Sequence, residues 1–450
     1  MFYGTTITHG VDPWQVFQRV NGRARVRVGG LWRLEDGAAR AGVSAQEPSI
    51  RLVREEDGSC VFDWTRAQSI TDGRWETEFD MPEGGLYRLE TCLDAVSAKS
   101  GEHWRFHGDM RMHLGCGDVF VIAGQSNAAG YGKGIAWDAP DVRVHVKRNS
   151  GLWDMAAHPL NDATDAADCP NAPMGQVGTS PFLSFGRRHA DFTGCPVGLI
   201  PAAQGGSPLK AWDPARDGYL YNNMIAKLHA VGRAAAILWY QGCTDASNGE
   251  ADIYFEGFER LVNATRREAG FDIPFYTFQL AGVLGRAENR GWDAVRQAQR
   301  RAAREITGVY ILSAAGSGMA DNIHISPSSN VLLGEQLSYV MDRGFRAPDL
   351  ISARLRGGKI ELKYENVRGE LNVRDPLARG FALRDAFGEV TIAEISAMAN
   401  TVTLMPARAL CGRVFVSAGC GSMPDVYPLM DSGTGLCALS FFDEPVSAEK

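Results

Sequence analysis

The pattern of hydrophobic and polar positions changes twice along the 450-residue chain. Up to about residue 115, short segments alternate polar and apolar side chains, as in "RARVRV" at 23–28, and no long helical period appears. Alternation with a period of two is typical of strands with one buried face. The segments "RWETEFDM" at 74–81 and "LYRLETCL" at 86–93 flank the turn "PEGG" in the manner of a hairpin. Residues 1–115 are therefore predicted to form a β-sandwich-like domain.

The pattern is different from residue 116 to residue 346. Here short apolar runs recur without alternation, at 118–124, 196–203, 234–242, 274–282 and 308–316. Such runs suit strands that are covered on both faces. Helix-like segments lie between the runs, for example at 180–192, 252–270 and 292–306. Strand and helix in alternation predict a three-layer α/β/α domain with about five parallel strands.

After "RAPDL" at 346–350 the pattern becomes β again. The segments at 358–364, 388–395 and 400–407 have the composition of half-buried strands. We expect a second, C-terminal β domain over residues 347–450.

Composition and charge exclude several classes of protein. The net charge of −7 argues against a protein that binds nucleic acid or anionic membranes. No run of about 18 apolar residues is present, so no membrane-spanning helix is expected. The first residues, "MFYGTTITHGVDPW", show neither the basic nor the apolar region of a signal peptide, which favours a cytoplasmic protein. The oligomeric state stays open, a homo-oligomer included.

Cysteine usage and motifs speak against a metal or cofactor. The nine cysteines are scattered, their number is odd and none forms a CxxC pair, so neither a disulfide framework nor a zinc site is expected. The motifs HExxH, the P-loop and a GxGxxG after a strand are absent. We therefore predict an activity that needs no metal and no cofactor.

Candidate chemistry begins at Ser126, directly after the first apolar run of the central region. In parallel α/β sheets, sites form at the carboxyl ends of the strands. The surrounding turn is not the GxSxG nucleophile elbow, because residue 128 is alanine. A serine in a glycine-flanked turn is usually a turn residue or a helix cap, so this turn alone does not establish catalysis.

Three further loops at predicted strand ends carry suitable groups. Gly205 and Gly206 allow a backbone N–H to approach a ligand, and the amide of Gln241 can donate to an oxyanion. Asp321 and His324 are three residues apart, so one turn can bring the carboxylate to the imidazole. Each feature has an ordinary alternative: a flexible loop, an amide that braces a loop, a surface histidine. Together, in this order, they predict a nucleophile, oxyanion donors and an acid–base pair.

These four segments resemble a known family. "GQSN" at 124–127, "GGS" at 205–207, "WYQG" at 239–242 and "DNIH" at 321–324 are similar to the sialate O-acetylesterase-like branch of the SGNH hydrolases. Trp212 and "WDAVRQAQ" at 292–299 are further matches. The resemblance implies a serine esterase that releases acetate from acetylated sugars or oligosaccharides.

The resemblance also implies roles for individual residues. Ser126 corresponds to the nucleophile, His324 to the base and Asp321 to the group that orients the base. The backbone N–H groups of Ser126 and of Gly206, rather than Gly205, correspond to oxyanion donors, and Gln241 to a side-chain donor. Four neighbouring residues are candidate substrate contacts: Gln125, Asn127, Trp212 and Cys243.

Cys243 departs from the family pattern. The family often has glutamate after the Gln-Gly pair, and Asp245 is the nearest carboxylate that could replace it. The departure leaves the substrate open to other acyl groups, such as a xylan-type acetyl ester, a lipid or a thioester. A non-catalytic carbohydrate-binding protein is the other alternative. A Cys243 nucleophile is disfavoured, because no base motif lies beside it.

Overall fold

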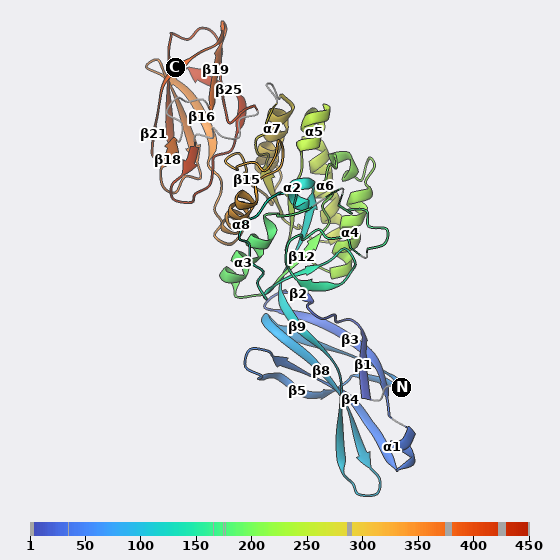
Figure 1. Ribbon diagram of the computed structural model, residues 1–450. Coiled ribbons are helices and arrows are strands. Elements are labelled where there is room, and N and C mark those ends of the chain that lie inside the picture. The colour runs from blue at the N-terminus through green and yellow to red at the C-terminus, as the bar shows by residue number, and fades with distance from the viewer. Residues whose placement is uncertain are drawn as a thin grey trace.

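The computed structural model describes residues 4–34, 36–164, 166–173, 175, 177–285, 290–373, 380–421 and 429–448. Figure 1 shows an elongated molecule with a β-rich part at each end and a central part in which helices surround a sheet. Three separate large hydrophobic cores correspond to these parts. The predicted order of a β region, an α/β/α region and a second β region is confirmed. The predicted limits of the domains stay predictions.

The N-terminal part contains two layers of strands. One is a four-stranded antiparallel sheet in the order β1-β3-β7-β6, formed by Gly4–His9, Arg23–Arg33, Arg74–Pro82 and Ser69–Thr71. The other contains β5, β4, β8 and the beginning of β9, formed by Cys60–Arg66, Val43–Arg54, Gly84–Ser97 and His103–Gly124. The short helix α1 (Asp36–Arg40) and strand β2 (Val16–Gln18) complete this part. Val26, Trp75 and Leu89 are among the buried side chains of its core.

The expected hairpin between residues 74–81 and 86–93 is wrong. Strand β7 pairs with β3 and β6, whereas β8 pairs with β4 and β9 in the other layer. Gly84 and Gly85 join them with φ values of 108° and 127°, a region of backbone space that favours glycine. The turn therefore carries the chain from one sheet to the other instead of back along the same sheet.

Strand β9 connects the N-terminal part to the central part without interruption. Its first portion pairs antiparallel with β8 up to Cys116, and its second portion pairs parallel with β12 and β13 from Asp118 to Gly124. The predicted limit between residues 115 and 116 thus lies inside a 22-residue strand. At the point where β9 passes from one part to the other, the backbone packs so closely that residue 117 has to be glycine: a Cβ on Gly117 would lie 1.8 Å from the carbonyl oxygen of Pro196.

The central sheet has the order β11-β10-β12-β9-β13-β14-β15. Its strands other than β9 are Trp153–Met155, Val144–Lys147, Val197–Pro201, Ala236–Tyr240, Phe275–Gln279 and Val309–Ser313. Neighbours from β10 to β15 are parallel, and β11 is an antiparallel edge strand. Five parallel strands were expected and six are present. The additional one, β10, has only four residues, and its sequence "VHVK" does not form an apolar run.

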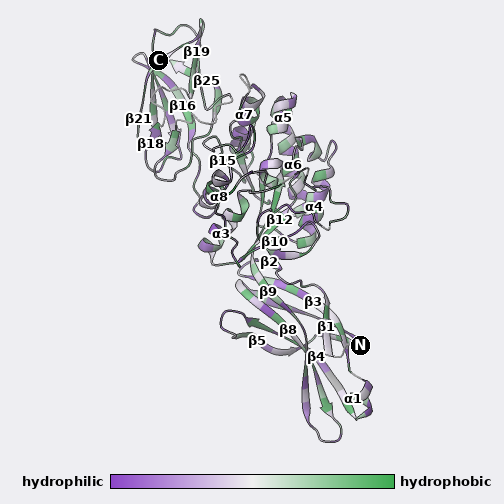
Figure 2. Ribbon diagram, viewed as in Figure 1, coloured by the Kyte–Doolittle hydropathy of each residue, from purple (hydrophilic) through white to green (hydrophobic). Residues whose placement is uncertain are grey.

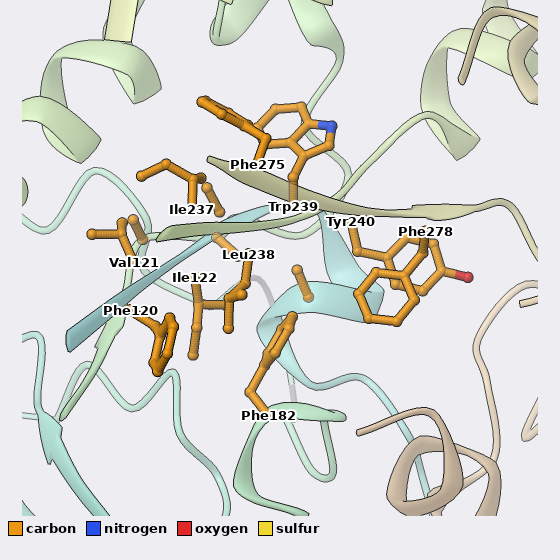
Figure 3. Close-up of a cluster of buried hydrophobic side chains, with 14 of the residues drawn as sticks. Phe120, Val121, Ile122, Phe182, Ile237, Leu238, Trp239, Tyr240, Phe275 and Phe278 are labelled. Carbon is orange, nitrogen blue, oxygen red and sulfur yellow. The ribbon is translucent and has the colours of Figure 1, made fainter. Parts of the chain in front are cut away.

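Helices cover both faces of this sheet (Figure 1). They are α2 to α8, at Ser126–Ala129, Phe182–Thr193, Tyr219–Val231, Cys243–Asn248, Tyr254–Ala269, Arg290–Glu305 and Pro327–Asp342, with 3-10 turns at Leu209–Ala211 and Ala251–Ile253. Figure 3 shows why the strands read as continuous apolar runs: side chains of β9 and β13, such as Ile122 and Trp239, extend into the core on either side of the sheet. In Figure 2 the strands of the central sheet are mostly hydrophobic, whereas those of the N-terminal part alternate between hydrophobic and hydrophilic residues.

The C-terminal part is an eight-stranded sheet in the order β20-β19-β23-β25-β16-β17-β22-β21, with a two-stranded β18-β24 pair beside it. In chain order from β16, the strands are Asp349–Arg356, Lys359–Glu365, Leu371–Val373, Phe381–Asp385, Gly388–Glu389, Ile392–Met398, Thr401–Pro406, Val414–Ala418, Leu429–Asp431 and Phe441–Ala448.

Buried polar groups of the central part hold this sheet. Gln279 donates to the carbonyl of Ser440 and accepts from its N–H, at 2.9 and 2.7 Å. Arg300 donates to Asp349 at 2.6 Å. Because both side chains are almost fully buried, the C-terminal part is joined to the central part by contacts that water does not screen.

A buried charge cluster lies where β9 enters the central sheet. The Asp118 carboxylate accepts from Arg19 at 2.7 Å and from His189 at 2.9 Å, and the other ring nitrogen of His189 lies 2.7 Å from Asp342. Burial opposes protonation of His189, but its hydrogen bonds to Asp118 and Asp342 raise its pKa to about 8. Burial raises the pKa of Asp118, but the hydrogen bonds from His189 and Arg19 lower it overall to about 2.

The cluster predicts a stability that falls as pH rises from 6 to 8.5. A histidine pKa above its unfolded value of about 6.5 stabilises the fold fully below pH ~6.5, and this contribution disappears as pH passes 8. The shift corresponds to about 2 kcal/mol. Thermal melts of the wild type should therefore show a falling Tm over this range, and His189→Gln should be less stable at pH 6 with a flatter profile. His229→Gln, which changes an exposed histidine, is the control. Parallel profiles for the wild type and His189→Gln would contradict this account.

Candidate active site

The backbone around Gly124 explains the position of Ser126. Gly124 ends β9 with φ 123°, and a Cβ at this position would lie 2.2 Å from the carbonyl oxygen of Tyr240 on β13. The next N–H, of Gln125, donates to the same carbonyl at 2.9 Å. The chain then enters α2, whose first residue is Ser126 and which ends at Gly130 in the left-handed region. The strand thus presents Ser126 at the carboxyl edge of the sheet, on a corner that only glycine can form.

The residues on both sides of Ser126 attach it to two other loops. The side-chain oxygen of Gln125 accepts from the N–H groups of Gly242 and Thr244, at 3.0 and 3.3 Å. Asn127 accepts from the N–H of Ile325 at 3.1 Å and donates to the carbonyl of Ile323 at 3.3 Å. Because Asn127 bonds the residues before and after His324, the serine turn and the histidine loop are fixed to each other.

Asp321 and His324 form a hydrogen-bonded pair. The Nδ1 atom of His324 lies 2.8 Å from Oδ2 of Asp321, and Oδ1 of Asp321 accepts from the N–H groups of Ile323 and His324, at 2.9 and 2.8 Å. Partial burial opposes ionisation of Asp321, but these hydrogen bonds lower its pKa to about 2. The ring of Tyr131 packs against the imidazole, with centroids 5.4 Å apart. The carboxylate thus occupies Nδ1 and leaves Nε2 for a second partner.

The loop after β12 lies against the serine turn. The N–H of Gln204 donates to the carbonyl of Gly124 at 3.0 Å, and the hydroxyl of Ser207 lies 3.4 Å from the same oxygen. Gly206 has φ 69°, and its carbonyl accepts from the Thr244 hydroxyl at 3.2 Å. In the part of the chain that the structure describes, the N–H groups of Ser126 and Gly206 donate to no protein acceptor. They are therefore available to a ligand atom.

The geometry of Gln241 differs from the prediction of an oxyanion donor. Its side chain is fully buried, and its amide nitrogen donates to the carbonyl of Ser207 at 3.1 Å and to the carboxylate of Asp245 at 2.5 Å. An amide NH₂ has two hydrogens, so both are in use. Asp245 also accepts from the N–H of Leu209 at 3.0 Å. In this structure Gln241 and Asp245 brace the loop that contains Gly206.

The four candidate substrate contacts are also parts of the scaffold. Gln125, Asn127, Trp212 and Cys243 are at most 3% exposed. The two amides make the backbone contacts described above, and the indole N–H of Trp212 donates to the hydroxyl of Ser207 at 3.0 Å. Burial raises the pKa of Cys243 to about 12, so its thiol stays protonated, which also disfavours a cysteine nucleophile. That these four side chains touch substrate stays a prediction, and in this structure Gln125, Asn127 and Trp212 hydrogen-bond the loops around Ser126 and Gly206.

Sequence reasoning missed Tyr131, Lys133 and Thr244. The ammonium group of Lys133 lies 3.5 Å from the Asp321 carboxylate. None of these residues belongs to a recognisable motif. The one signal in the sequence is that Tyr131 and Lys133 follow Ser126 by five and seven residues. Among the described residues, no group of three or more His, Cys, Asp and Glu side chains could hold a metal ion. Within the same residues, every helix is too short or too polar to cross a membrane.

The chain is similar to known carbohydrate esterases. Residues 116–343, just over half of the chain, match the family described as carbohydrate esterase, sialic acid-specific acetylesterase. A probable carbohydrate esterase of Arabidopsis thaliana is 27% identical over 243 residues, which cover 49% of this chain and 88% of the relative. A solved structure of a carbohydrate acetylesterase from Xanthomonas citri has a similar fold, with a TM-score of 0.66, 21% identity and coverage of 97% of this chain and 99% of that chain.

The central part, with its serine turn, its Asp–His pair and the loops that brace them, is the region that the family match covers. The protein is accordingly a carboxylic ester hydrolase that acts on acetylated carbohydrates, and the chain belongs to the sialic acid-specific acetylesterase family of carbohydrate esterases.

Proposed function

We propose that the protein removes O-acetyl groups from sugars by a serine mechanism with a covalent acetyl-enzyme, in which Ser126, His324 and Asp321 act as a triad. The observation that carries the proposal is the position of Asn127. This residue follows Ser126 directly and hydrogen-bonds the backbone on both sides of His324. A nucleophile and its base need a fixed mutual position, and Asn127 supplies it.

The first half of the reaction forms the acetyl-enzyme. The Oγ atom of Ser126 attacks the carbonyl carbon of the acetyl group, and Nε2 of His324 takes the hydroxyl proton. The negative charge that develops on the carbonyl oxygen is stabilised by the N–H groups of Ser126 and Gly206. The intermediate then collapses, the bond to the sugar oxygen breaks, and His324 gives its proton to this oxygen. The deacetylated sugar leaves with a free hydroxyl group.

The second half repeats these roles with water. His324 takes a proton from a water molecule, whose oxygen attacks the acetyl-Ser126 carbonyl, and the proton returns to the Ser126 oxygen as acetic acid leaves, which ionises to acetate in water. Asp321 does not exchange protons. With a pKa lowered to about 2, it stays ionised and stabilises the imidazolium that forms in each half.

The experiment that tests the substrate class is acetate release from a panel of acetylated monosaccharides and oligosaccharides, with xylan-type, lipid and thioester substrates beside them. The proposal expects acetylated sugars to give the highest kcat/KM. A clear preference for a lipid ester or a thioester would replace the substrate class but keep the triad. No turnover with any ester would contradict the mechanism.

Ser126→Ala should lower kcat by several orders of magnitude and leave only the residual rate that binding and the oxyanion donors provide. The matched variant is Cys243→Ala, which removes the other nucleophile-type side chain near the site and should keep most of the activity. Trapping of the acetyl-enzyme on Ser126, seen as the added mass of an acetyl group, would complete the assignment. Turnover at the wild-type rate in a folded Ser126→Ala protein would end the triad proposal.

The activity should fall at acid pH, because only the neutral imidazole of His324 can accept the serine proton. Asp321 does not cause this decrease, since its pKa is about 2. Asp321→Asn should retain more activity than His324→Ala, because it removes only the group that orients the imidazole, whereas His324→Ala removes the group that transfers the proton. The measurement is kcat/KM from pH 5 to 9 for the three proteins. A flat profile for the wild type would identify a different base.

Gln241→Ala tests the bracing role. The substitution removes the amide donor to the Ser207 carbonyl, at a cost of about 1–3 kcal/mol for a buried group that loses its partner, and leaves the Asp245 carboxylate with the N–H of Leu209. We expect a lower Tm and a decrease in kcat of less than about a hundredfold. A direct oxyanion donor would instead show a loss of about 10²–10³ in kcat at unchanged Tm. Melting and steady-state kinetics on the same preparation separate the two roles.

A further inference from the structure

The segment between α2 and β10 lies beside His324 and Asp321 in the candidate active site. Tyr131 packs on the imidazole of His324, and Lys133 lies 3.5 Å from Asp321. Gly134 is next, and a Cβ at this position would lie 3.6 Å from Pro327 at the start of α8. The first half of the segment is thus fixed to the rim of the candidate active site.

The second half of the segment is fixed as well. The carboxylate of Asp138 is buried and lies 2.8 Å from Nε2 of His158 and 2.7 Å from the guanidinium of Arg187. Arg187 also donates to the carbonyl of Ala139 at 3.0 Å. The residues between Gly134 and Asp138 therefore form a short span that is held at both ends.

This span carries two apolar side chains in full contact with water. Ile135 is 100% exposed and Trp137 is 88% exposed. The indole contributes little to a core although the span that carries it is anchored by buried charges, so the faces of the ring are accessible to a ligand. Three Cα–Cα steps separate Trp137 from Gly134, so its backbone lies at most about 11 Å from the rim.

The size of the patch limits what it can bind. A tryptophan side chain covers up to roughly 250 Å², whereas a stable protein–protein interface needs about 800 Å² from each partner. The side chains of Ile135 and Trp137 together are too small for a stable interface with a second copy of the chain. They match one flat ring with an apolar face, and a pyranose presents such a face through its C–H groups. An indole adds its N–H as a polar contact beside this face.

We infer that Trp137 is a stacking platform for a sugar ring adjacent to the one that is deacetylated, so that the preferred substrates are acetylated oligosaccharides or polysaccharides instead of free acetylated monosaccharides. This inference rests on the proposed function. The acetyl group enters between Ser126 and Gly206, and a neighbouring ring of the same glycan extends past Lys133 and lies on the indole. Trp137 is a specificity residue here, since the acetyl carbonyl does not touch it.

The test compares Trp137→Ala with the wild type on p-nitrophenyl acetate, on 6-O-acetylglucose and on partially acetylated xylotetraose and cellotetraose. Trp137→Phe keeps an aromatic face, and Phe387→Ala removes an aromatic side chain that is 79% exposed in the C-terminal part. We expect Trp137→Ala to lower kcat/KM about tenfold on the tetrasaccharide that the wild type prefers, mainly through KM. Its values on the two small substrates should stay within twofold, Trp137→Phe should recover part of the loss, and Phe387→Ala should match the wild type.

Four outcomes would overturn the platform. One is an unchanged kcat/KM of Trp137→Ala on the tetrasaccharide, another is an equal loss on all substrates, and the third is a changed elution volume on size exclusion, which would assign the patch to a second copy. A wild type that deacetylates 6-O-acetylglucose but no tetrasaccharide would also overturn it and leave the proposed function intact. A wild type that cleaves p-nitrophenyl acetate but no acetylated sugar would instead refute the proposed function itself. Equal Tm values for all variants show that folding does not cause the differences.

Discussion

The close contact between the ends of β9 and β13 is the constraint on which the site depends. At Gly124 the two strands are so near that the Tyr240 carbonyl occupies the space of a side chain, and the same carbonyl then receives the N–H of Gln125. The chain has one way out of this contact, a sharp turn into α2. Ser126 is therefore placed by backbone geometry before any side chain contributes. Hydrogen bonds then attach three loops to this turn: those after β12 and β13 and the loop of His324. A substitution that displaces the backbone at Gly124 would therefore move all three.

Neutral amides make most of these attachments. Gln125, Asn127 and Gln241 are buried at the centre of the arrangement, and their amides bind backbone groups of neighbouring loops. A hydrogen-bonded buried amide costs much less than a buried ion, although the side-chain oxygen of Gln241 has no hydrogen-bond partner among the described residues. Of the acidic side chains Asp245 and Asp321, the first is buried beside Gln241, whereas the second is partly exposed and is matched by His324 and Lys133. In the proposed mechanism, the donors to the oxyanion are then the two backbone N–H groups of Ser126 and Gly206.

The sequence was sufficient for the layers and for the loops that carry the chemistry. Short apolar runs such as 118–124 and 234–242 identify strands buried on both faces, because they are too short for a typical helix and alternate with helix-like segments. It was not sufficient for β10, whose four residues include a buried histidine, or for the partners of β7 and β8, because alternation reveals a buried face but not which neighbour a strand pairs with.

The roles of the polar residues in the motifs were the hardest to predict. "GQSN" and "WYQG" look like substrate contacts because polar side chains stand at strand ends. Whether Gln125 or Gln241 faces a ligand or a neighbouring loop depends on contacts between separate loops, such as Gln125 with Gly242, 117 positions away, and Gln241 with Ser207, 34 positions away. The exposed Trp137 has the converse problem, since in sequence a tryptophan reads as a core residue.

The contacts of Gln279, Arg296 and Arg300 have a consequence for how this architecture can be recombined. Gln279 ends β14 and both arginines belong to α7, and all three donate hydrogen bonds to the C-terminal part, through Ser440, Gly421 and Asp349. Gln279 and Arg296 also donate within the central part, Gln279 to the carbonyl of Arg296 and Arg296 to the carbonyls of Leu280 and Ala281. Removal of the C-terminal part would therefore break buried hydrogen bonds of each side chain, at about 1–3 kcal/mol for each buried donor or acceptor that loses its partner. The C-terminal sheet thus completes the hydrogen bonding of the catalytic part and is not an independent module. Gene fusion or domain exchange at this point would succeed only together with apolar replacements in β14 and α7, so that the two parts are bound to evolve as one unit.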